Sequence, residues 1–268
     1  MSRIREKFAQ LKRDTAKGFI PFVTAGDPNL DISREIVLKL AELRASVIEL
    51  GVPFSDPMAD GPTIQLSSQR ALLNGVNIRN IFDLVSDVRK KTEVPIVLFS
   101  YLNPLFQFGL EKLRDEAARI GIDGILITDV IDVEANEISD MLAEKSLDLI
   151  SLIAPTTSDQ RIEKISSLSK GFIYAVSRAG VTGARSVSSS AAESLVTRAR
   201  KYTDLPIAVG FGISTQSQIE DVWRYADAAV VGSAIVSEIA KSNDSSQTVQ
   251  TVEAFVTSLL PQVAKSST

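Results

Sequence analysis

Two carboxylates near the end of one apolar segment are the strongest candidates for chemistry in this sequence. Glu49 interrupts the apolar run Ser46–Leu50, and Asp60 follows on a loop that contains two prolines and a glycine. Because proline fixes φ, this loop is expected to be stiff, and Asp60-Gly61-Pro62 is typical of the start of a helix. One carboxylate in a buried strand and one on a stiff loop form a candidate acid/base pair.

Both carboxylates also have ordinary explanations. A carboxylate that lines a packed interior is costly unless it is paired or functional, so Glu49 could instead pair with a lysine or arginine of a neighbouring helix. Asp60 and Asp56 could be turn residues, because aspartate beside glycine or proline is common in turns. For Glu49 the functional interpretation is favoured, since the apolar run around it leaves the side chain little room to face solvent.

Missing residue types narrow the chemistry. The chain has 268 residues and contains neither cysteine nor histidine. This excludes a disulfide framework, a thiolate nucleophile, cysteine-ligated metal sites and every histidine-based triad. Acid/base catalysis must therefore depend on Asp, Glu, Tyr or Lys.

The composition is that of an ordinary globular protein. Hydrophobic residues make up 44%, charged residues 23%, and the net charge is −4, which argues against nucleic acid or an acidic membrane surface as the main partner. Residues 1–18 lack the apolar core of a signal peptide, and no apolar run approaches the roughly 18 residues of a membrane span. We therefore expect a cytoplasmic protein without a membrane segment.

The elements that must position the carboxylates alternate between strand and helix. Short apolar runs predict eight strands, at Phe19–Thr24, Ser46–Leu50, Pro95–Tyr101, Gly124–Thr128, Asp148–Leu152, Phe172–Val176, Pro206–Gly210 and Asp227–Val231. Amphipathic patterns predict helices at Leu30–Leu43, Ile78–Lys91, Leu110–Ile120, Val133–Lys145, Asp159–Ser169, Ala191–Tyr202, Thr215–Tyr225 and Gln247–Leu260.

This alternation predicts a parallel sheet that is buried on both faces. Eight units without a break in composition fit a single (β/α)8 TIM barrel domain over residues 1–268 better than a doubly wound sheet. Residues 1–14 are expected to form a helix that caps the bottom of the barrel. Ile235–Ala240 should form an extra short helix after strand eight, and residues 261–268 a flexible tail.

Barrels of this kind carry their active sites on the loops that follow the strands. Strands seven and eight are followed by Gly210-Phe211-Gly212 and Gly232-Ser233, where the fold commonly binds phosphate through backbone N–H groups and a helix N-terminus. Alternatively, these glycines only turn the chain and cap the helix. The long loop 177–190, rich in small residues, is expected to be a mobile lid.

Several motifs, taken in order along the chain, resemble the tryptophan synthase alpha chain family. They are Phe19 to Pro28 (FIPFVTAGDP), Glu49 to Gln65 (ELGVPFSDPMADGPTIQ), Ser177 to Gly183 (SRAGVTG), Gly210 to Ser214 (GFGIS) and Gly232 to Val236 (GSAIV). The resemblance covers nearly the whole chain. The combination is specific, although no single glycine motif is.

The resemblance implies retro-aldol cleavage of indole-3-glycerol phosphate to indole and D-glyceraldehyde 3-phosphate, without a cofactor or metal in this chain. Glu49 matches the catalytic acid/base, which delivers a proton to indole C3 and removes one from the glycerol hydroxyl. Asp60 matches the carboxylate that holds the indole N–H and stabilises positive charge on the ring. Burial would raise the pKa of Glu49 toward that of a general acid near neutral pH.

Other positions implied by the resemblance surround the substrate. Phe22, Tyr101 and Tyr174 match residues that line the indole pocket, and Tyr174 also matches one that assists proton transfer. Thr182 matches the lid residue that closes over the site. The phosphate cradle and the remaining substrate-binding positions match Gly183, Phe211, Gly212, Gly232 and Ser233. Tyr174 could instead be an ordinary aromatic of the barrel interior, and Thr182 a plain loop residue.

The resemblance also implies a partner. The family works with a beta chain that carries pyridoxal phosphate, usually in an alpha2beta2 heterotetramer, and indole passes to it through a tunnel. The loop around Pro53–Asp56 and the segment Tyr101–Phe108 would then face that partner. The family commonly has proline two residues after Asp129, where this chain has Ile131, so the loop shape and the partner contact there could differ.

Three other functions are less consistent with the sequence. Another phosphate-binding barrel enzyme would be expected to carry a catalytic lysine or cysteine at a strand end, and the predicted strands contain neither. A pseudoenzyme that only activates the beta chain would not need a buried carboxylate, so Glu49, Asp60 and Thr182 together favour an enzyme. A binding module would leave the clustered acids and glycines unexplained.

Overall fold

Eight parallel strands form a closed barrel in the computed structural model, which describes residues 2–176, 189–210, 212–241 and 245–261. Each strand pairs with the next along the chain, and β8 closes the ring by pairing with β1. The strands are β1 (Gly18–Thr24), β2 (Ile48–Gly51), β3 (Ile96–Ser100), β4 (Gly124–Ile127), β5 (Asp148–Ile153), β6 (Ile173–Val176), β7 (Ile207–Gly210) and β8 (Ala228–Val231).

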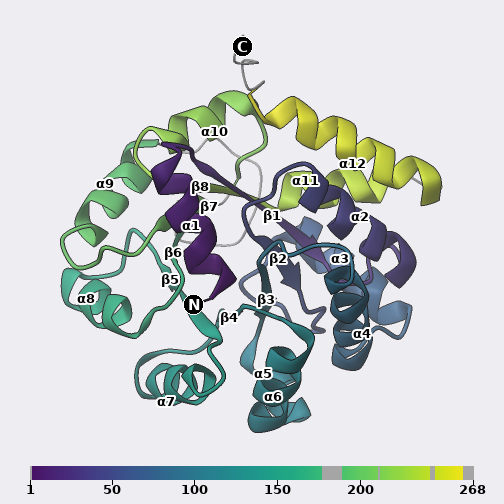
Figure 1. The fold of residues 1–268 in the computed structure, drawn as a ribbon, viewed down its shortest axis with the longest axis horizontal. Coiled ribbons are helices and arrows are strands. Elements are labelled where there is room, and N and C mark those ends of the chain that lie inside the picture. The colour runs from purple at the N-terminus through teal and green to yellow at the C-terminus, as the bar shows by residue number, and fades with distance from the viewer. Residues whose placement is uncertain (1, 177–188, 211, 242–244, 262–268) are drawn as a thin grey trace.

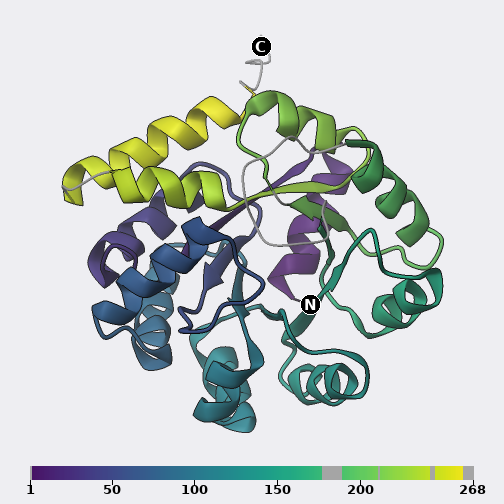
Figure 2. The ribbon, with the colours of Figure 1, turned by 180° about the vertical axis from the view of Figure 1, so that it is seen from behind.

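Helices surround this barrel, as seen from its two ends in Figures 1 and 2. In chain order they are α1 (Arg3–Arg13), α2 (Leu30–Glu42), α3 (Pro62–Leu73), α4 (Ile78–Arg89), α5 (Leu102–Phe108), α6 (Leu110–Ile120), α7 (Asp132–Ala143), α8 (Asp159–Leu168), α9 (Ser189–Ala199), α10 (Gln216–Trp223), α11 (Ser233–Lys241) and α12 (Ser245–Leu259). Among the described residues, none of these helices is long and apolar enough to cross a membrane.

The strands are apolar throughout because the sheet is covered on both faces. Side chains alternate between the two faces of a strand. One set, which includes Ile20, Val47 and Ile150, fills the interior of the barrel, and the other set, which includes Phe19 and Ile48, packs under the helices. Glu49 of β2 lies two residues after Val47, so its side chain is on the same, interior face.

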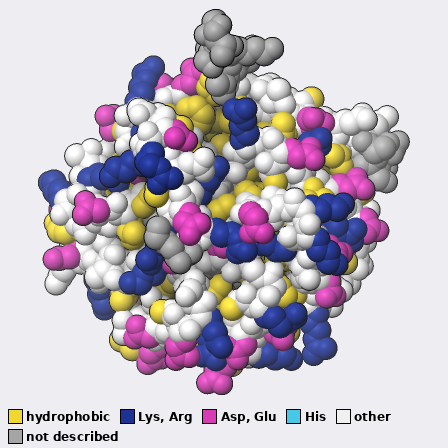
Figure 3. All heavy atoms as spheres, in the orientation of Figure 1, with side chains coloured by type: hydrophobic (Ala, Val, Ile, Leu, Met, Phe, Trp, Pro, Cys, Tyr) yellow, Lys and Arg dark blue, Asp and Glu magenta, His cyan; other side chains and the backbone are white. Residues whose placement is uncertain are grey.

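Helix α1 closes the end of the barrel at which the strands begin. Ile4 and Phe8 are buried against the interior side chains, and the ring centroids of Phe8 and Phe172 are 5.7 Å apart. Figure 1 shows α1 lying across this end, and Figure 3 shows Lys and Arg side chains interspersed with Asp and Glu over the same face. The predicted capping helix is confirmed.

The predicted barrel and all eight predicted strands are confirmed, with ends shifted by at most two residues. The helix start predicted at Pro62 is confirmed as the first residue of α3. The extra helix after strand eight, α11, is longer than predicted because its first residue follows directly on Gly232. No helix is predicted between Tyr101 and Leu110, yet α5 lies there; its seven residues are too few to show a helical repeat.

Candidate active site

A cavity of about 520 Å³ opens at the end of the barrel where the strands finish. Side chains from several strands line it, among them Phe22 of β1, Glu49 of β2 and Tyr174 of β6. Asp60 lines it from the loop between β2 and α3, and Ser233 from the start of α11. The barrel therefore brings both candidate carboxylates to one cavity, as the sequence predicts.

Glu49 is the most unusual side chain in this cavity. It is only 1% exposed, and within the described part of the chain its Oε1 has no hydrogen-bond partner. Its backbone is in register with Phe22 on β1 and Val97 on β3. Burial raises the pKa of Glu49 to about 8 because water no longer stabilises the charged form. The carboxyl group is therefore mostly protonated at neutral pH, and an ion pair with a helix is not what holds it.

Asp60 is held by its own loop and by Tyr101. The Asp60 N–H donates to the Pro57 carbonyl at 3.0 Å, and the Tyr101 hydroxyl donates to Asp60 Oδ2 at 3.2 Å. The same hydroxyl accepts from the Ala59 N–H at 2.9 Å. Burial raises the pKa of Asp60 to about 6, against the lowering effect of the Tyr101 hydrogen bond. Asp60 is thus mostly ionised at the pH where Glu49 is mostly protonated.

Tyr174 is packed into the barrel beside these carboxylates. Burial, together with the nearby Glu49, raises the pKa of its hydroxyl well above the ordinary value. Room for the ring exists because residue 210 is glycine: a Cβ on Gly210 would lie 2.1 Å from the Tyr174 hydroxyl oxygen. Similarly, a Cβ on Gly51 would lie 2.5 Å from the Phe22 ring. These two glycines shape the aromatic wall of the cavity.

The other part of the cavity is suited to an anion. Gly212, with φ of +76°, and Gly232 both line it, and α11 begins directly after Gly232. The Val236 N–H donates to the Gly232 carbonyl at 3.1 Å, which is the first turn of this helix. The first N–H groups of a helix have no partner within it and attract negative charge.

The structure brings most of the predicted site residues together. The cavity is lined by Phe22, Glu49, Asp60, Tyr174, Gly212, Gly232 and Ser233. Tyr101 does not line the cavity, although its hydroxyl donates a hydrogen bond to Asp60, which does. Thr182, Gly183 and Phe211 lie outside the described residues. Among the residues that the structure describes, no group of three or more Asp or Glu side chains could hold a metal ion.

Several cavity residues were not predicted. They include Ile64, Phe99, Thr128, Leu152 and Ile153. The alternation of strand side chains carries the signal for two of them: Phe99 lies two residues after the interior Val97, and Leu152 lies two residues after the interior Ile150. Ile64 follows no such rule, because it enters the cavity from the first turn of α3.

Comparisons with known proteins agree with this geometry. A sequence model of the family described as "Tryptophan synthase alpha chain" matches residues 8–264. The chain belongs to the tryptophan synthase alpha chain family. A relative of that name from Citrifermentans bemidjiense is 47% identical over 267 residues and covers 100% of both chains. One from Geobacter sulfurreducens is 48% identical over 236 residues, covering 88% of this chain and 89% of the relative.

Solved structures give the same result. A crystal structure of tryptophan synthase subunit alpha from Legionella pneumophila str. Paris is 32% identical, with a TM-score of 0.88 and 97% of each chain covered. A tryptophan synthase structure from Mycobacterium tuberculosis is 32% identical, with a TM-score of 0.88 and 96% of each chain covered. The reaction of this family is cleavage of indole-3-glycerol phosphate to indole and glyceraldehyde 3-phosphate, which makes the chain a lyase of tryptophan biosynthesis.

Proposed function

We propose that Glu49 and Asp60 perform the family's reaction in the cavity described above. The observation that carries the proposal is the Glu49 carboxyl group, which is buried and has a pKa of about 8. Such a group is a general acid poised near neutral pH. A structural role would normally supply a buried carboxylate with hydrogen bonds or a cation.

The two carboxyl groups divide the reaction between them. Protonated Glu49 donates its proton to indole C3, and ionised Asp60 accepts the indole N–H and stabilises the positive charge that develops on the ring. The Glu49 carboxylate then takes the proton of the glycerol hydroxyl next to the ring. As the carbonyl forms, the bond to C3 breaks and its electrons return to the ring, giving indole and the aldehyde. Glu49 is protonated again at the end of the cycle.

Phosphate and ring occupy different parts of the cavity in this proposal. Gly212, Gly232 and Ser233 hold the phosphate through backbone N–H groups at the start of α11 and the Ser233 hydroxyl. Phe22 and Tyr174 contact the indole ring, and Tyr174 assists proton transfer near Glu49. The family needs no cofactor in this chain.

A beta chain is the proposed partner, and exposed apolar side chains support its position. Among the described residues, all large hydrophobic side chains that are strongly exposed lie in the three βα connections after β2, β3 and β4. They are Met58, Leu66, Leu72, Leu73, Phe106, Ile131 and Val133. Exposed apolar side chains that gather on neighbouring connections are typical of interaction surfaces. They include part of the predicted surface around Tyr101–Phe108, and Ile131 itself.

We propose that this surface binds a pyridoxal-phosphate beta chain in an alpha2beta2 assembly, to which indole passes directly. The pyridoxal phosphate belongs to that partner. The role of the family in amino-acid biosynthesis supports a cytoplasmic location.

Indole release from indole-3-glycerol phosphate, measured with and without a beta chain, tests both parts of the proposal. A rate that rises with the beta chain supports the reaction and the partnership. A rate of indole release that is the same with and without the beta chain would contradict the proposed partner surface. A folded chain without turnover in either condition would favour the pseudoenzyme alternative and remove Glu49 and Asp60 from their roles.

A further inference from the structure

Helix α3 determines where the backbone of Asp60 lies. It begins at Pro62, directly after Gly61, and its first turn has no side-chain cap. Gln65 on this helix donates from Nε2 to the Asp60 carbonyl at 2.9 Å. A shift of α3 would therefore carry Asp60 with it.

An ion pair that is buried on the aspartate side fixes α3 to the loop that follows β1. Arg70 Nε donates to Asp27 Oδ1, and Arg70 Nη2 donates to Asp27 Oδ2, both at 2.7 Å. The Asp27 side chain is fully buried, whereas Arg70 is 35% exposed. Two parallel N–H bonds from a planar guanidinium fix direction as well as distance, so this pair sets the orientation of α3.

Further contacts reinforce the same connection. The hydroxyl oxygens of Thr24 and Ser67, both buried, are 2.6 Å apart. Asn74 Nδ2, just after α3, donates to the Pro28 carbonyl at 2.6 Å. Helix α3 is therefore tied, along its middle and at its end, to residues 24–28.

The loop at residues 24–28 is a direct continuation of β1, and β1 also positions Glu49. Phe22 of β1 is in register with Glu49 of β2. The pairing of β1 with β2 thus fixes the position of Glu49 relative to β1. Helix α3 and its ion pair fix the position of Asp60 relative to the same strand. The two carboxylates are also connected through residues 50–59 and through Tyr101, which follows β3 and donates to Asp60.

We propose that Asp27 and Arg70 are positioning residues for the cleavage reaction, which hold α3 so that Asp60 meets the indole ring while Glu49 faces C3. The inference rests on the proposed roles of Glu49 and Asp60. Neither Asp27 nor Arg70 lines the cavity, so both act through Asp60. A displacement of about 1 Å at a catalytic group can lower the rate about 10²-fold.

The test is a double-mutant cycle in the full chain, with turnover of indole-3-glycerol phosphate measured in the presence of a beta chain. Asp27→Asn keeps the size of the side chain and removes the charge that Arg70 binds. We expect kcat to fall about 10- to 100-fold in the parent background. In an Asp60→Asn background the same substitution should lower kcat less than about threefold, because Asp60 can no longer be misplaced.

Asp123→Asn is the matched control, because Asp123 is also a buried aspartate paired with arginine but lies at the opposite end of the barrel. It should change kcat less than about twofold in either background. Equal loss of kcat from Asp27→Asn in both backgrounds, or no loss in the parent, would overturn the inference. A full rate in Asp60→Asn alone would instead remove the proposed role of Asp60, and the inference with it.

Arg70→Lys provides a second test should Asp27→Asn not fold. Lysine keeps the charge but cannot form both bonds, so kcat should fall about three- to tenfold. Affinity for glycerol 3-phosphate, a probe of the phosphate cradle alone, should stay within about twofold of the parent, because Gly212 and Gly232 lie on other loops. A parallel fall in that affinity would indicate a general disturbance and contradict a positioning role.

Discussion

Buried or half-buried carboxylates lie at both ends of this barrel, and the two ends use them differently. Glu49 and Asp60 lie where the strands finish, and Asp123 and Asp148 lie where the strands begin. Burial raises the pKa of all four. The difference is in the partners that the fold supplies.

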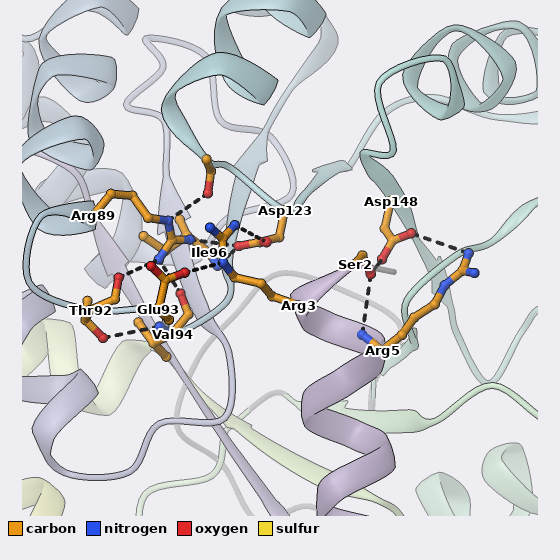
Figure 4. A network of polar contacts seen from close by, with 11 residues as sticks. Ser2, Arg3, Arg5, Arg89, Thr92, Glu93, Val94, Ile96, Asp123 and Asp148 are labelled. Atoms are coloured by element: carbon orange, nitrogen blue, oxygen red, sulfur yellow. Dashed lines mark hydrogen bonds and ion pairs between the residues drawn. The ribbon is translucent and has the colours of Figure 1, made fainter.

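At the end covered by α1, each carboxylate has several donors. Asp123 accepts from Arg3 Nη1 at 3.0 Å, from Arg89 Nη2 at 2.7 Å and from the Ile96 N–H at 2.9 Å (Figure 4). These donors oppose the rise in the pKa of Asp123 that burial causes. They also connect α1, α4 and the start of β3, so this carboxylate holds the closed end of the barrel together.

At the open end, no described cation pairs with Glu49 or Asp60, whereas Asp27, which lies outside the cavity, is paired with Arg70. In the described part of the chain, Glu49 forms no ion pair, and Asp60 receives one side-chain hydrogen bond, from the Tyr101 hydroxyl. A charge on either group is costly, and a substrate that supplies a proton to Glu49 or a hydrogen bond to Asp60 relieves that cost. The partners, rather than the residue type or the burial, thus separate the proposed catalytic carboxylates, Glu49 and Asp60, from the structural ones.

Glu49→Gln should give the largest effect and the sharpest contrast between the two ends. We expect indole formation to fall about 10³-fold, since glutamine cannot transfer the proton. The free energy of unfolding should rise. A folded-state pKa of about 8, above the ordinary 4.5, means that the parent loses stability as pH rises between these values, on the order of 3 kcal/mol by pH 7. Glutamine has no charge to bury.

Urea unfolding at pH 5 and pH 8, beside a turnover assay, measures both effects. Glu35→Gln is the matched control, because Glu35 is exposed on α2; it should leave rate and stability within error of the parent. A Glu49→Gln variant that keeps its activity would show that the buried carboxyl group is not the acid.

Asp123→Asn should give the opposite result. Removing one partner of a buried ion pair leaves the other charge uncompensated, which costs about 3 kcal/mol. Arg89, only 9% exposed, is the charge left behind. Urea unfolding should show this loss, while kcat stays within about twofold of the parent at a temperature where the variant is folded. A large fall in kcat without loss of stability would contradict the division between the two ends.

The pH dependence of the reaction should reflect the ionisation of both Glu49 and Asp60. Below about pH 6 Asp60 becomes protonated, and above about pH 8 Glu49 loses its proton, so kcat/KM should fall on both sides, about tenfold per pH unit. Stopped assays from pH 5 to 9, with unfolding checked at each pH, measure the profile. Asp60→Asn should remove the acidic limb and leave the alkaline one. A flat profile in the parent would contradict both assignments.

Much of this arrangement could be predicted from the sequence because it depends on local patterns. Eight apolar runs, each long enough for one strand, indicate a parallel barrel once helices alternate with them. The same alternation places Glu49 in the interior, since it lies two residues after Val47. The glycines after strands seven and eight also predict where an anion would bind, because phosphate commonly binds at these two loops in this fold.

Contacts between distant residues could not be predicted. Nothing local indicates that the hydroxyl of Tyr101 reaches Asp60, or that Arg70 pairs with Asp27, because each contact depends on how segments distant in the sequence pack against one another. The steric need for Gly210 is hidden in the same way, since it arises from the Tyr174 ring on the neighbouring strand. Such contacts influence the pKa values and the positions of Glu49 and Asp60, and only the three-dimensional structure reveals them.

Asp148 has two kinds of partner, the Arg5 guanidinium and the Ser2 hydroxyl, and substituting them should give the smallest effects (Figure 4). Arg5 Nη2 lies 3.6 Å from Asp148 Oδ1 and is 48% exposed, whereas the Ser2 hydroxyl donates to Asp148 Oδ2 at 2.5 Å and also caps α1. Exposed ion pairs contribute little, so Arg5→Gln should change the free energy of unfolding by less than about 0.5 kcal/mol. Ser2→Ala removes a partly buried hydrogen bond and a helix cap, and should cost about 1 kcal/mol. Both values come from urea unfolding at neutral pH, and a larger loss from Arg5→Gln would show that charge, rather than hydrogen bonding, holds α1 at this position.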